Sequence, residues 1–494
     1  MTEPTPRPIL VAGTWKPGRG PIVPSIYPAD GSVVGEVATA DPSDVDDAIS
    51  GAAEAFRTSG WAQRAPHARA RTLARVADRI EDEAEELAQL QRLDNGKPIT
   101  ETRALVASAA GTFRYIAGAL ETLEDELTPA RGPYLTMSIH EPIGVIGAIT
   151  PWNSPIASEA QKLAPALAAG NAVVLKPAEA TPLVALEVGR ILLDAGVPPG
   201  LVSVLPGEGS TVGDAIVRHP EVGKVSFTGG TDTGRQIAHV AADKVMPVTL
   251  ELGGKSPTVV FDDAERDHAL AGVAFGIFGS AGQACIAGSR LFVQRSIADD
   301  FVSDLVDLAK RIPIGDPADA AVRIGPLISQ GHRERVDDYV RSAVDDGGTV
   351  LTGGAPTDPV LRRGSWYEPT IITGLDPSAR ACREEIFGPV LVVLPFDDEA
   401  DAIEQANTGE YGLAAGIWTR DMRRAWRVAR ALRAGTVWCN TYKQLSIATP
   451  FGGIGASGVG REKGRHGIRQ YMHQKGLYWG LNEDPLPWAG PPMA

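Results

Sequence analysis

Cysteine is scarce in this sequence: Cys285, Cys382 and Cys439 are the three in a chain of 494 residues. So few, so far apart, do not make a disulfide framework, and we expect free thiols in a reducing cytoplasm. The sequence also lacks any apolar run of about 18 residues, so it predicts no transmembrane helix. Its first residues, MTEPTPRP, lack the basic and then apolar layout of a signal peptide.

Blocks of positive charge are absent too. Lysine and arginine number 47 against 61 aspartate and glutamate, a net charge of −14 at pH 7. We therefore expect neither nucleic acid nor a membrane surface as a partner, and we attribute the excess acid to solubility. The eight histidines are scattered without ligand spacing, which predicts no catalytic metal. The length and the 43% hydrophobic content indicate two or three domains.

A regular alternation of apolar runs and helical segments fills residues 143–261. Apolar strands separated by helices indicate a parallel sheet covered on both faces, with ligands at the carboxyl ends of its strands. The expected strands are Val145–Ile149, Ala172–Leu175, Val202–Leu205, Lys224–Phe227 and Val248–Leu250, and helices are expected near 156–169, 182–196, 211–218 and 231–242.

A second α/β region is indicated for residues 262–440. A strand is expected at Leu391–Leu394 and helices near 297–311 and 330–345. Before the main alternation, we expect helices over 43–58, 65–95 and 98–126, and we expect the first 40 residues, rich in Pro and Gly, to lie over the surface.

Two further strands stand outside this alternation, at Tyr134–His140 and Gly476–Trp479. They could pair as a protruding arm. An exposed strand edge is a liability in a monomer and useful for oligomerisation, although an ordinary edge hairpin fits the spacing equally well.

Cys285 lies among small residues, in Gly282-Gln283-Ala284-Cys285-Ile286-Ala287-Gly288. Small neighbours let a substrate and a backbone amide approach the sulfur, as a nucleophile requires. A lone free cysteine is nevertheless more often inert core filling.

Polar and glycine residues follow the predicted strands where ligands are expected. Asn153 could donate to an oxyanion, a contact that contributes about 3 kcal/mol to transition-state stabilisation. Lys176 and Glu179 could bind ribose hydroxyls, and the glycines of Phe227–Gly234 allow a diphosphate near a helix start, although they do not form G-x-G-x-x-G. Glu251 could act as a general base, while a loop cap is the alternative for each motif.

Together these segments resemble the aldehyde dehydrogenase superfamily, of the NAD(P)-dependent, non-phosphorylating kind, over essentially the whole chain. Seven segments stand in the family's order: Pro151-Trp152-Asn153, Lys176-Pro177-Ala178-Glu179, Phe227-Thr228-Gly229 through Gly234, Glu251-Leu252-Gly253-Gly254-Lys255, Gly282-Gln283-Ala284-Cys285, Glu384-Glu385-Ile386-Phe387-Gly388-Pro389-Val390 and Pro450-Phe451-Gly452-Gly453.

The resemblance implies the catalytic roles. Cys285 attacks the aldehyde and forms a thiohemiacetal, Asn153 and the Cys285 amide hold the oxyanion, hydride transfer leaves a thioester, and Glu251 activates the water that hydrolyses it. The implied cofactor is NAD, because the Glu179 carboxylate should repel the 2'-phosphate of NADP. The implied cofactor contacts are Thr150, Pro151, Trp152, Lys176, Glu179, Gly229, Gly230, Gly234, Leu252, Gly253, Glu385 and Phe387. Gly230 departs from the family's common serine.

The substrate is less sharply indicated. Positions that carry large apolar residues in members that take apolar aldehydes hold Ser154, Ser158 and Gln161 here, which favours a polar or carboxylated aldehyde, such as a semialdehyde from catabolism. Lys443 is a candidate counter-charge, unless it points to solvent. An aromatic or heteroaromatic aldehyde is the alternative, because Trp152, Tyr442 and Phe451 could flank a ring. The predicted pocket comprises Ser154, Ser158, Gln161, Ala284, Ile286, Lys443 and Phe451.

Three other functions are weighed against these residues. Coenzyme A-acylating relatives usually lack a glutamate at position 251, a non-catalytic protein of the same fold could have lost Cys285 or Glu251, and a cysteine hydrolase would need a paired histidine. Hydrolytic aldehyde oxidation fits best.

The expected architecture is α/β, a Rossmann-like doubly wound parallel sheet for the cofactor plus a second α/β catalytic domain and a small β oligomerisation arm. We assign residues 1–125 and 143–252 to the NAD-binding domain, 253–469 to the catalytic domain, and 126–142 and 470–494 to the arm. We expect a homodimer or homotetramer.

Overall fold

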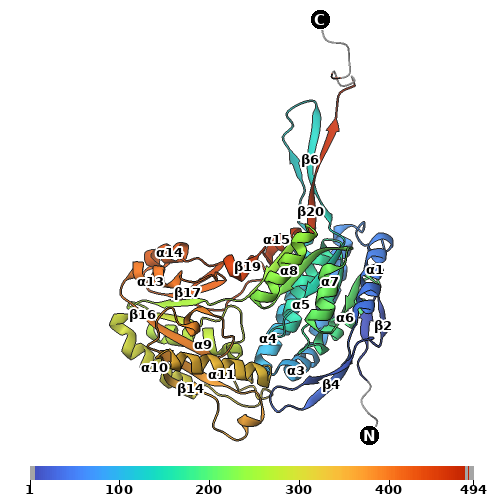
Figure 1. Ribbon diagram of the computed structural model, residues 1–494. Helices are drawn as coiled ribbons and strands as arrows, with labels where there is room; N and C mark the ends of the chain where they lie inside the picture. The colour runs from blue at the N-terminus through green and yellow to red at the C-terminus, as the bar shows by residue number, and fades with distance from the viewer. Residues whose placement is uncertain (1–5, 484–487, 489–494) are drawn as a thin grey trace.

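The computed structural model describes residues 6–483 and residue 488, and it contains two large sheets that lie side by side (Figure 1). The first has eight strands in the order β19-β11-β10-β7-β8-β9-β1-β2. Its parallel centre comprises β7 (Val145–Ile149), β8 (Ala172–Lys176), β9 (Val202–Val204), β10 (Val222–Thr228) and β11 (Val248–Glu251). These are the five predicted strands, which confirms the doubly wound sheet.

Helices connect these strands close to the predicted limits. They are α5 (Pro155–Ala168), α6 (Leu183–Asp194), α7 (Asp214–Arg218) and α8 (Thr231–Asp243), and a π turn at Gly209–Gly213 precedes α7. Because α5 packs between the sheet and other helices, almost all its side chains are buried. Leu163 and Leu167 are fully buried.

The N-terminal segment differs from the prediction that the first 40 residues lie over the surface. β1 (Ile9–Val11) is buried and pairs antiparallel with β9, and β2 (Thr14–Lys16) follows at the edge. The short Ile-Leu-Val run covers apolar surface at the end of the sheet, which outweighs the Pro and Gly around it. The hairpin of β3 (Ile22–Ile26) and β4 (Val33–Ala38) is separate.

The helices before the sheet also differ in detail. α1 (Pro42–Thr58) matches its prediction and starts with a capping box at Asp41. The predicted helix over 65–95 is two helices, α2 (Pro66–Asp82) and α3 (Ala84–Asn95), because Glu83 leaves the helical conformation at φ −102° and ψ 16°. α4 (Ile99–Glu121) ends before residue 126, where a strand begins.

The second sheet has seven strands in the order β14-β15-β16-β13-β12-β17-β18, parallel apart from β14 (Thr349–Gly354). The other strands are β12 (Pro257–Val260), β13 (Arg290–Gln294), β15 (Glu368–Thr373), β16 (Val390–Phe396), β17 (Ala414–Trp418) and β18 (Thr436–Cys439). Its helices include α9 (Arg266–Phe278), α10 (Ala298–Arg311), α11 (Gln330–Asp345) and α14 (Met422–Ala431). The predicted second α/β region is confirmed.

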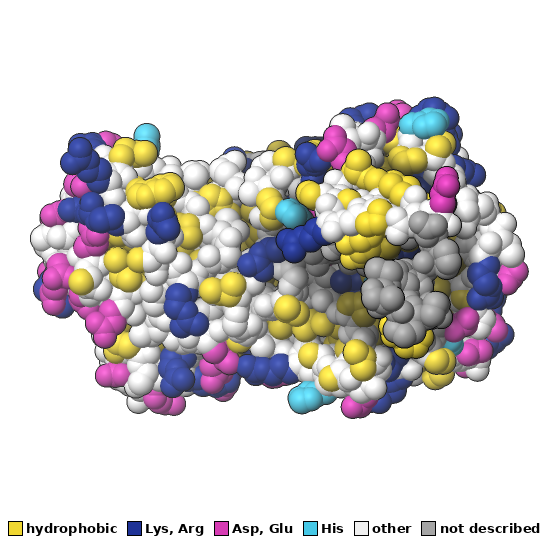
Figure 2. All heavy atoms as spheres, turned by 90° about the horizontal axis from the view of Figure 1, so that it is seen from above, with side chains coloured by type: hydrophobic (Ala, Val, Ile, Leu, Met, Phe, Trp, Pro, Cys, Tyr) yellow, Lys and Arg dark blue, Asp and Glu magenta, His cyan; other side chains and the backbone are white. Residues whose placement is uncertain are grey.

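The two isolated strands do pair. β6 (Tyr134–Pro142) runs antiparallel to β20 (Met472–Gly480), with β5 (Glu126–Thr128) on its other side, and the three project from the body as an arm (Figure 1). On the face from which the arm rises, acidic and basic side chains are interspersed with apolar ones (Figure 2). The predicted arm segment 470–494 extends over 484–487 and 489–494, which lie outside the described residues.

One short strand ties the two halves together. β19 (Gly458–Val459) pairs antiparallel with β11 of the first sheet, although the sequence places it among residues of the second region. It brings the following α15 (Gly464–Arg469) to the end of β11. The predicted domain limits remain a prediction. Across residues 6–483, no helix combines the length and apolar character needed to cross a membrane.

Candidate active site

Three segments that are distant in sequence meet at the carboxyl ends of β7 and β11. Asn153 follows β7, Glu251 ends β11, and Cys285 follows the 3-10 turn Gly279–Gly282 after α9. The Asn153 Nδ2 donates to the carbonyl of Gln283 at 3.0 Å. A Cβ on Gly254 would lie 2.6 Å from the Cys285 carbonyl, so the Glu251 segment touches the cysteine loop. The structure therefore brings the three predicted catalytic residues together.

The loop before Cys285 has an unusual backbone. Ser280 and Ala281 adopt left-handed conformations with φ of 62° and 52°, and Gly282 follows at φ 70°. A Cβ on Gly282 would lie 2.0 Å from the Gly388 carbonyl, so only glycine fits there. Two successive non-glycine residues in this region are strained and need support from their surroundings.

Glu101 of α4 supplies that support. Its carboxylate accepts the Ser280 backbone N–H at 2.8 Å and the Ser280 hydroxyl at 2.6 Å, and the Lys97 Nζ lies 3.3 Å away. Burial alone would raise the pKa of Glu101, but Lys97 and the two bonds from Ser280 lower the pKa below its ordinary value. We call this arrangement the Glu101 clasp.

Gln283 fixes the other side of the loop. Its Oε1 accepts the Ile328 N–H at 2.8 Å and its Nε2 donates to the Pro326 carbonyl at 3.4 Å. The sulfur of Cys285 is thus presented by a loop held through side chains on both sides.

The environment of Cys285 disfavours a free thiolate. The half-buried side chain packs against an apolar cluster that includes Ile286, Trp438 and Tyr442. Burial, together with the nearby carboxylates of Glu385 and Glu251, raises the pKa of the Cys285 thiol to about 12. At neutral pH the thiol is therefore protonated, and its attack on a carbonyl requires a base or a change of charge nearby.

Glu251 is buried, and neither of its carboxylate oxygens has a hydrogen-bond partner among the described residues. Burial and the neighbouring Glu462 raise its pKa well above the ordinary value. Glu462 itself pairs with the buried Lys162 at 2.6 Å, and Lys162 also donates to the Ser226 hydroxyl at 3.1 Å. A raised pKa suits a group that takes a proton near neutral pH.

Polar groups without partners and open backbone lie at the carboxyl ends of the first sheet's strands. The buried Thr150 hydroxyl has no partner among the described residues, and Lys176 lies 3.4 Å from the exposed Glu179, which also accepts the Gly209 N–H. Open space surrounds Gly230 immediately before α8, where helix N–H groups attract phosphate.

Glycines allow close contacts near these strand ends. A Cβ on Gly234 would lie 2.4 Å from the Leu252 side chain, and one on Gly253 would lie 2.2 Å from the Glu385 carboxylate. Glu385 also accepts the Gly254 N–H at 2.9 Å. A Cβ on Gly229 would lie 2.5 Å from the Phe227 ring. The structure thus places Gly234 against Leu252 and Gly253 against Glu385, and the cofactor role of these residues stays a prediction.

Aromatic rings pack together beside Asn153. The Trp152 ring lies edge-on to that of Phe387, with 5.2 Å between centroids, and Pro151 precedes it. The His332 Nε2 contacts the Phe387 carbonyl at 2.8 Å, where Phe387 has a φ of 60°. Sequence reasoning missed His332, which belongs to no motif.

The predicted substrate residues fall into two groups. Ser154 and Ser158 hydrogen-bond each other at 3.0 Å, and Gln161 follows one turn later on α5. Lys443 does not extend into solvent: its Nζ donates to the carbonyls of Phe275 at 3.3 Å and Gly279 at 3.1 Å. Burial lowers the pKa of Lys443 to about 8. Ala284, Ile286 and Phe451 pack around Cys285.

Lys463 is a second cation near the cysteine that the sequence did not reveal. It stands just before α15 with a φ of 61°, and its Nζ lies 5.4 Å from the centroid of the Phe451 ring. Like Glu101 and Lys162, it carries no motif signal, because its partners are remote in sequence.

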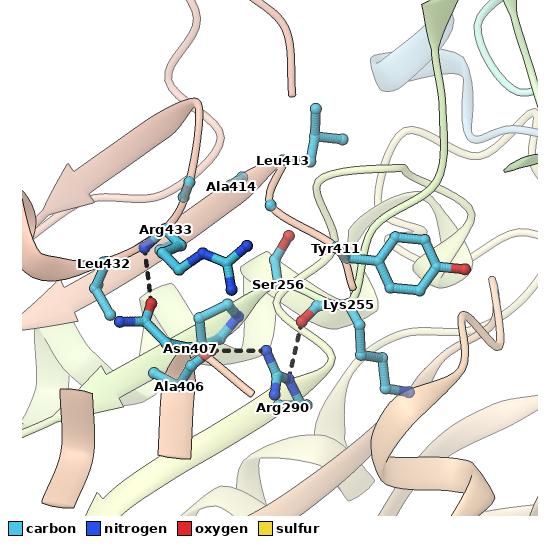
Figure 3. A pocket seen from close by; sticks show the side chains of 14 residues that line it. Lys255, Ser256, Arg290, Ala406, Asn407, Tyr411, Leu413, Ala414, Leu432 and Arg433 are labelled. Atoms are coloured by element: carbon cyan, nitrogen blue, oxygen red, sulfur yellow. Dashed lines mark hydrogen bonds between the residues drawn. The ribbon is translucent and has the colours of Figure 1, made fainter. Parts of the chain in front are cut away.

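The lining of a further cavity includes Ser256, Asn407 and Arg433 (Figure 3). The Lys255 side chain turns away from it, while the Lys255 carbonyl accepts the Arg290 Nε at 2.9 Å. Burial lowers the pKa of Lys255 to about 7. This cavity contains no predicted site residue. Of the other thiols, Cys382 is buried in the core and Cys439 is exposed.

The fold and the site define a class of enzyme that binds a dinucleotide and attacks its substrate with a cysteine. The family model described as "Aldehyde dehydrogenase family" matches residues 15–477. The chain is 41% identical to the peroxisomal aminoaldehyde dehydrogenase 2 of Pisum sativum, over 100% of this chain and 99% of that protein.

Solved structures of aldehyde dehydrogenases superpose closely on this chain. A putative aldehyde dehydrogenase from Burkholderia cenocepacia superposes with a TM-score of 0.95 at 42% identity, covering 98% of this chain and 99% of that chain. A point mutant of betaine aldehyde dehydrogenase from Staphylococcus aureus, solved with NAD+, gives 0.96 at 37% identity, with 98% and 99% covered. The chain belongs to the aldehyde dehydrogenase family. It is an oxidoreductase that uses a nicotinamide dinucleotide to convert an aldehyde to a carboxylic acid.

Proposed function

We propose that Cys285, Asn153 and Glu251 carry out this oxidation in two stages. The observation that carries the proposal is their convergence: Asn153 donates to the cysteine loop, and Gly254 of the Glu251 segment contacts Cys285. In the first stage the Cys285 sulfur bonds to the aldehyde carbon and its proton leaves to a base. The Asn153 amide, which has a second N–H, and the Cys285 N–H hold the resulting oxyanion.

The cofactor, when bound, supplies a hydride acceptor, so the carbon on Cys285 is oxidised from thiohemiacetal to thioester. In the second stage Glu251 takes a proton from water as the water oxygen bonds to the carbonyl carbon. The carbon–sulfur bond then breaks, and the acid and the Cys285 thiol are released. A buried carboxylate with two unpaired oxygens favours this hydrolysis over transfer to coenzyme A.

We propose NAD rather than NADP as the cofactor. Glu179 is exposed beside Lys176 at the end of β8, where a ribose would lie. Its carboxylate can accept ribose hydroxyls and would repel a 2'-phosphate. The backbone amides at the start of α8 would hold the diphosphate, with Gly230 leaving room for it.

The proposed substrate is a polar aldehyde. Ser154, Ser158 and Gln161 present hydroxyl and amide groups, and an alkyl substrate would leave such groups without partners at a cost of roughly 1–3 kcal/mol each. The relatives are named for betaine aldehyde and aminoaldehydes, which are also polar. An aromatic aldehyde has less support, since Trp152 packs against Phe387 and the Tyr442 hydroxyl donates to the Ile286 carbonyl.

We further propose that the arm of β5, β6 and β20 joins subunits into a homodimer or homotetramer. Its exposed Leu127, Tyr478 and Trp479 would be covered in such an assembly. Three free thiols support a reducing compartment such as the cytoplasm.

The test is the absorbance of reduced nicotinamide with NAD and NADP in parallel, over neutral, charged and aromatic aldehydes. Activity with NAD should fall by at least about 10⁴-fold in Cys285→Ala. Cys439→Ala removes an exposed thiol and should leave the rate unchanged. Equal losses in both variants, or activity that survives Cys285→Ala, would refute the assignment.

A further inference from the structure

Backbone hydrogen bonds of the two neighbouring residues fix the position of Lys463. The preceding residue, Glu462, exchanges two backbone hydrogen bonds of 2.8 Å with Phe451, and the Gly464 N–H donates to the Ile447 carbonyl at 2.9 Å. The left-handed φ of 61° at Lys463 is rare for a residue with a side chain. These contacts fix the direction of the side chain, whose Nζ lies over the Phe451 ring.

Phe451 and Cys285 both pack against one apolar cluster, which contains Ile286 and Trp438. The charge of Lys463 acts on both Cys285 and Glu251 and offsets part of the rise in the pKa of each that burial causes. Burial lowers the pKa of Lys463, and the charges of Glu462, Cys285 and Glu251 counteract this. The half-buried amine therefore lies near both reacting groups.

Lys463 has no carboxylate of its own. Among the described residues it makes no ion pair or side-chain hydrogen bond. The adjacent Glu462 is already paired with Lys162 at 2.6 Å, and Glu251 is buried behind it. A cation that is half removed from water and lacks a partner suits an external anion.

A second cation approaches Cys285 from another element. Lys443 lies in the loop after β18, and two of its three N–H groups donate to the carbonyls of Phe275 and Gly279 at the end of α9, which leaves one donor. The Glu101 carboxylate, whose charge acts on Lys443, is hydrogen-bonded by Ser280 and paired with Lys97. Both lysines thus lie near Cys285, and neither makes an ion pair with a carboxylate of the described residues.

We propose that Lys463, assisted by Lys443, binds a carboxylate at the far end of the substrate, so that the physiological aldehyde is an anionic semialdehyde. This rests on the proposed oxidation at Cys285 and narrows its substrate from polar to anionic. It also separates this enzyme from relatives named for betaine aldehyde and aminoaldehydes, whose substrates carry the opposite charge. The same two lysines would repel such a cation.

The experiment compares three four-carbon aldehydes that differ only at the far end, with a carboxylate, a methyl or a trimethylammonium group. In the wild-type enzyme kcat/KM should be highest for the carboxylate and lowest for the trimethylammonium compound. Lys463→Met should lower the carboxylate-to-methyl ratio about tenfold, mainly through KM, while Lys463→Arg should preserve it. Arg465→Met removes an exposed cation of α15 that contacts the Thr122 carbonyl, and it should change nothing.

Each other outcome is informative. A wild-type preference for trimethylammonium, or an unchanged ratio in Lys463→Met, would overturn the proposal while leaving the oxidation itself intact. An equal fall in kcat/KM for all three aldehydes would instead mean that Lys463 acts through Cys285 or Glu251 and does not bind the far end of the substrate. If Lys463→Met fails to fold, Lys463→Gly tolerates the left-handed backbone and tests the same ratio. Absence of activity with every aldehyde would refute the underlying reaction, not only the charge preference.

Discussion

The cofactor side and the substrate side of this active site are built differently. On the cofactor side, Thr150 and Lys176 stand at the ends of the neighbouring strands β7 and β8, and the sheet fixes their spacing. On the substrate side, Cys285, Lys443 and Lys463 stand on loops whose positions depend on remote side chains. The Glu101 clasp joins residues 179 apart in sequence. A sheet positions groups through backbone pairing, whereas loops need individual polar contacts, so single substitutions should affect the two sides differently.

The largest effect is expected where the two sides meet. Glu251→Gln removes the base and should lower kcat about 10²- to 10⁴-fold, with the thioester accumulating. Because burial raises the pKa of Glu251, the wild-type group is protonated at low pH and cannot accept a proton. Wild-type kcat should therefore rise with pH through this pKa, and the residual activity of the variant should lack that rise.

The measurement is a pH profile of kcat together with a pre-steady-state burst of reduced nicotinamide. A burst retained in Glu251→Gln would place the defect in hydrolysis. A lost burst with an unchanged pH profile would contradict the assignment of Glu251 as the hydrolytic base.

An intermediate effect is expected from the Glu101 clasp, which acts on Cys285 only through the loop. Glu101→Gln keeps an acceptor for the Ser280 N–H but loses the charge that balances Lys97 and an acceptor for the hydroxyl. The two lost charge-assisted contacts should lower kcat/KM about tenfold for every aldehyde, whatever its charge.

The rate of Cys285 alkylation by iodoacetamide, measured without cofactor, should fall in parallel, while NAD affinity stays constant. Glu121→Gln, at the exposed end of α4, is the matched control. Weakened NAD binding, or a normal alkylation rate beside a lower kcat/KM, would show that the clasp does not position the cysteine.

The smallest effect is expected at Glu179 on the cofactor side. Its carboxylate is exposed and partly neutralised by Lys176, so Glu179→Gln should raise the NADP-to-NAD ratio of kcat/KM only about threefold. Steady-state kinetics with both cofactors measures it. A fall in this ratio would mean that Glu179 does not face the 2'-position.

The same contrast explains which features the sequence could predict. The five parallel strands and the motifs at their ends were predictable, because fully apolar runs and their order carry that information. β1 was missed, because three apolar residues among prolines and glycines give a weak signal, and the break at Glu83 has neither Gly nor Pro to mark it.

The charged contacts of the substrate side were not predictable. The pairs Glu101–Ser280 and Lys162–Glu462 join residues that only the folded chain brings together, and nothing in the segment around Lys463 marks it as a ligand-binding residue. Lys443 was identified, but its two bonds to the end of α9 depend on how that helix stops.

The pairing of β19 with β11 has a consequence for biosynthesis. Glu251 is translated near the middle of the chain, yet the strand beside it and Lys463 come more than 200 residues later. A nascent chain whose second sheet is still emerging from the ribosome can form most of the first sheet. Its reaction centre still lacks β19 and Lys463. Competence should therefore appear late and abruptly during synthesis, once the last segments have emerged and closed on a scaffold that is already folded.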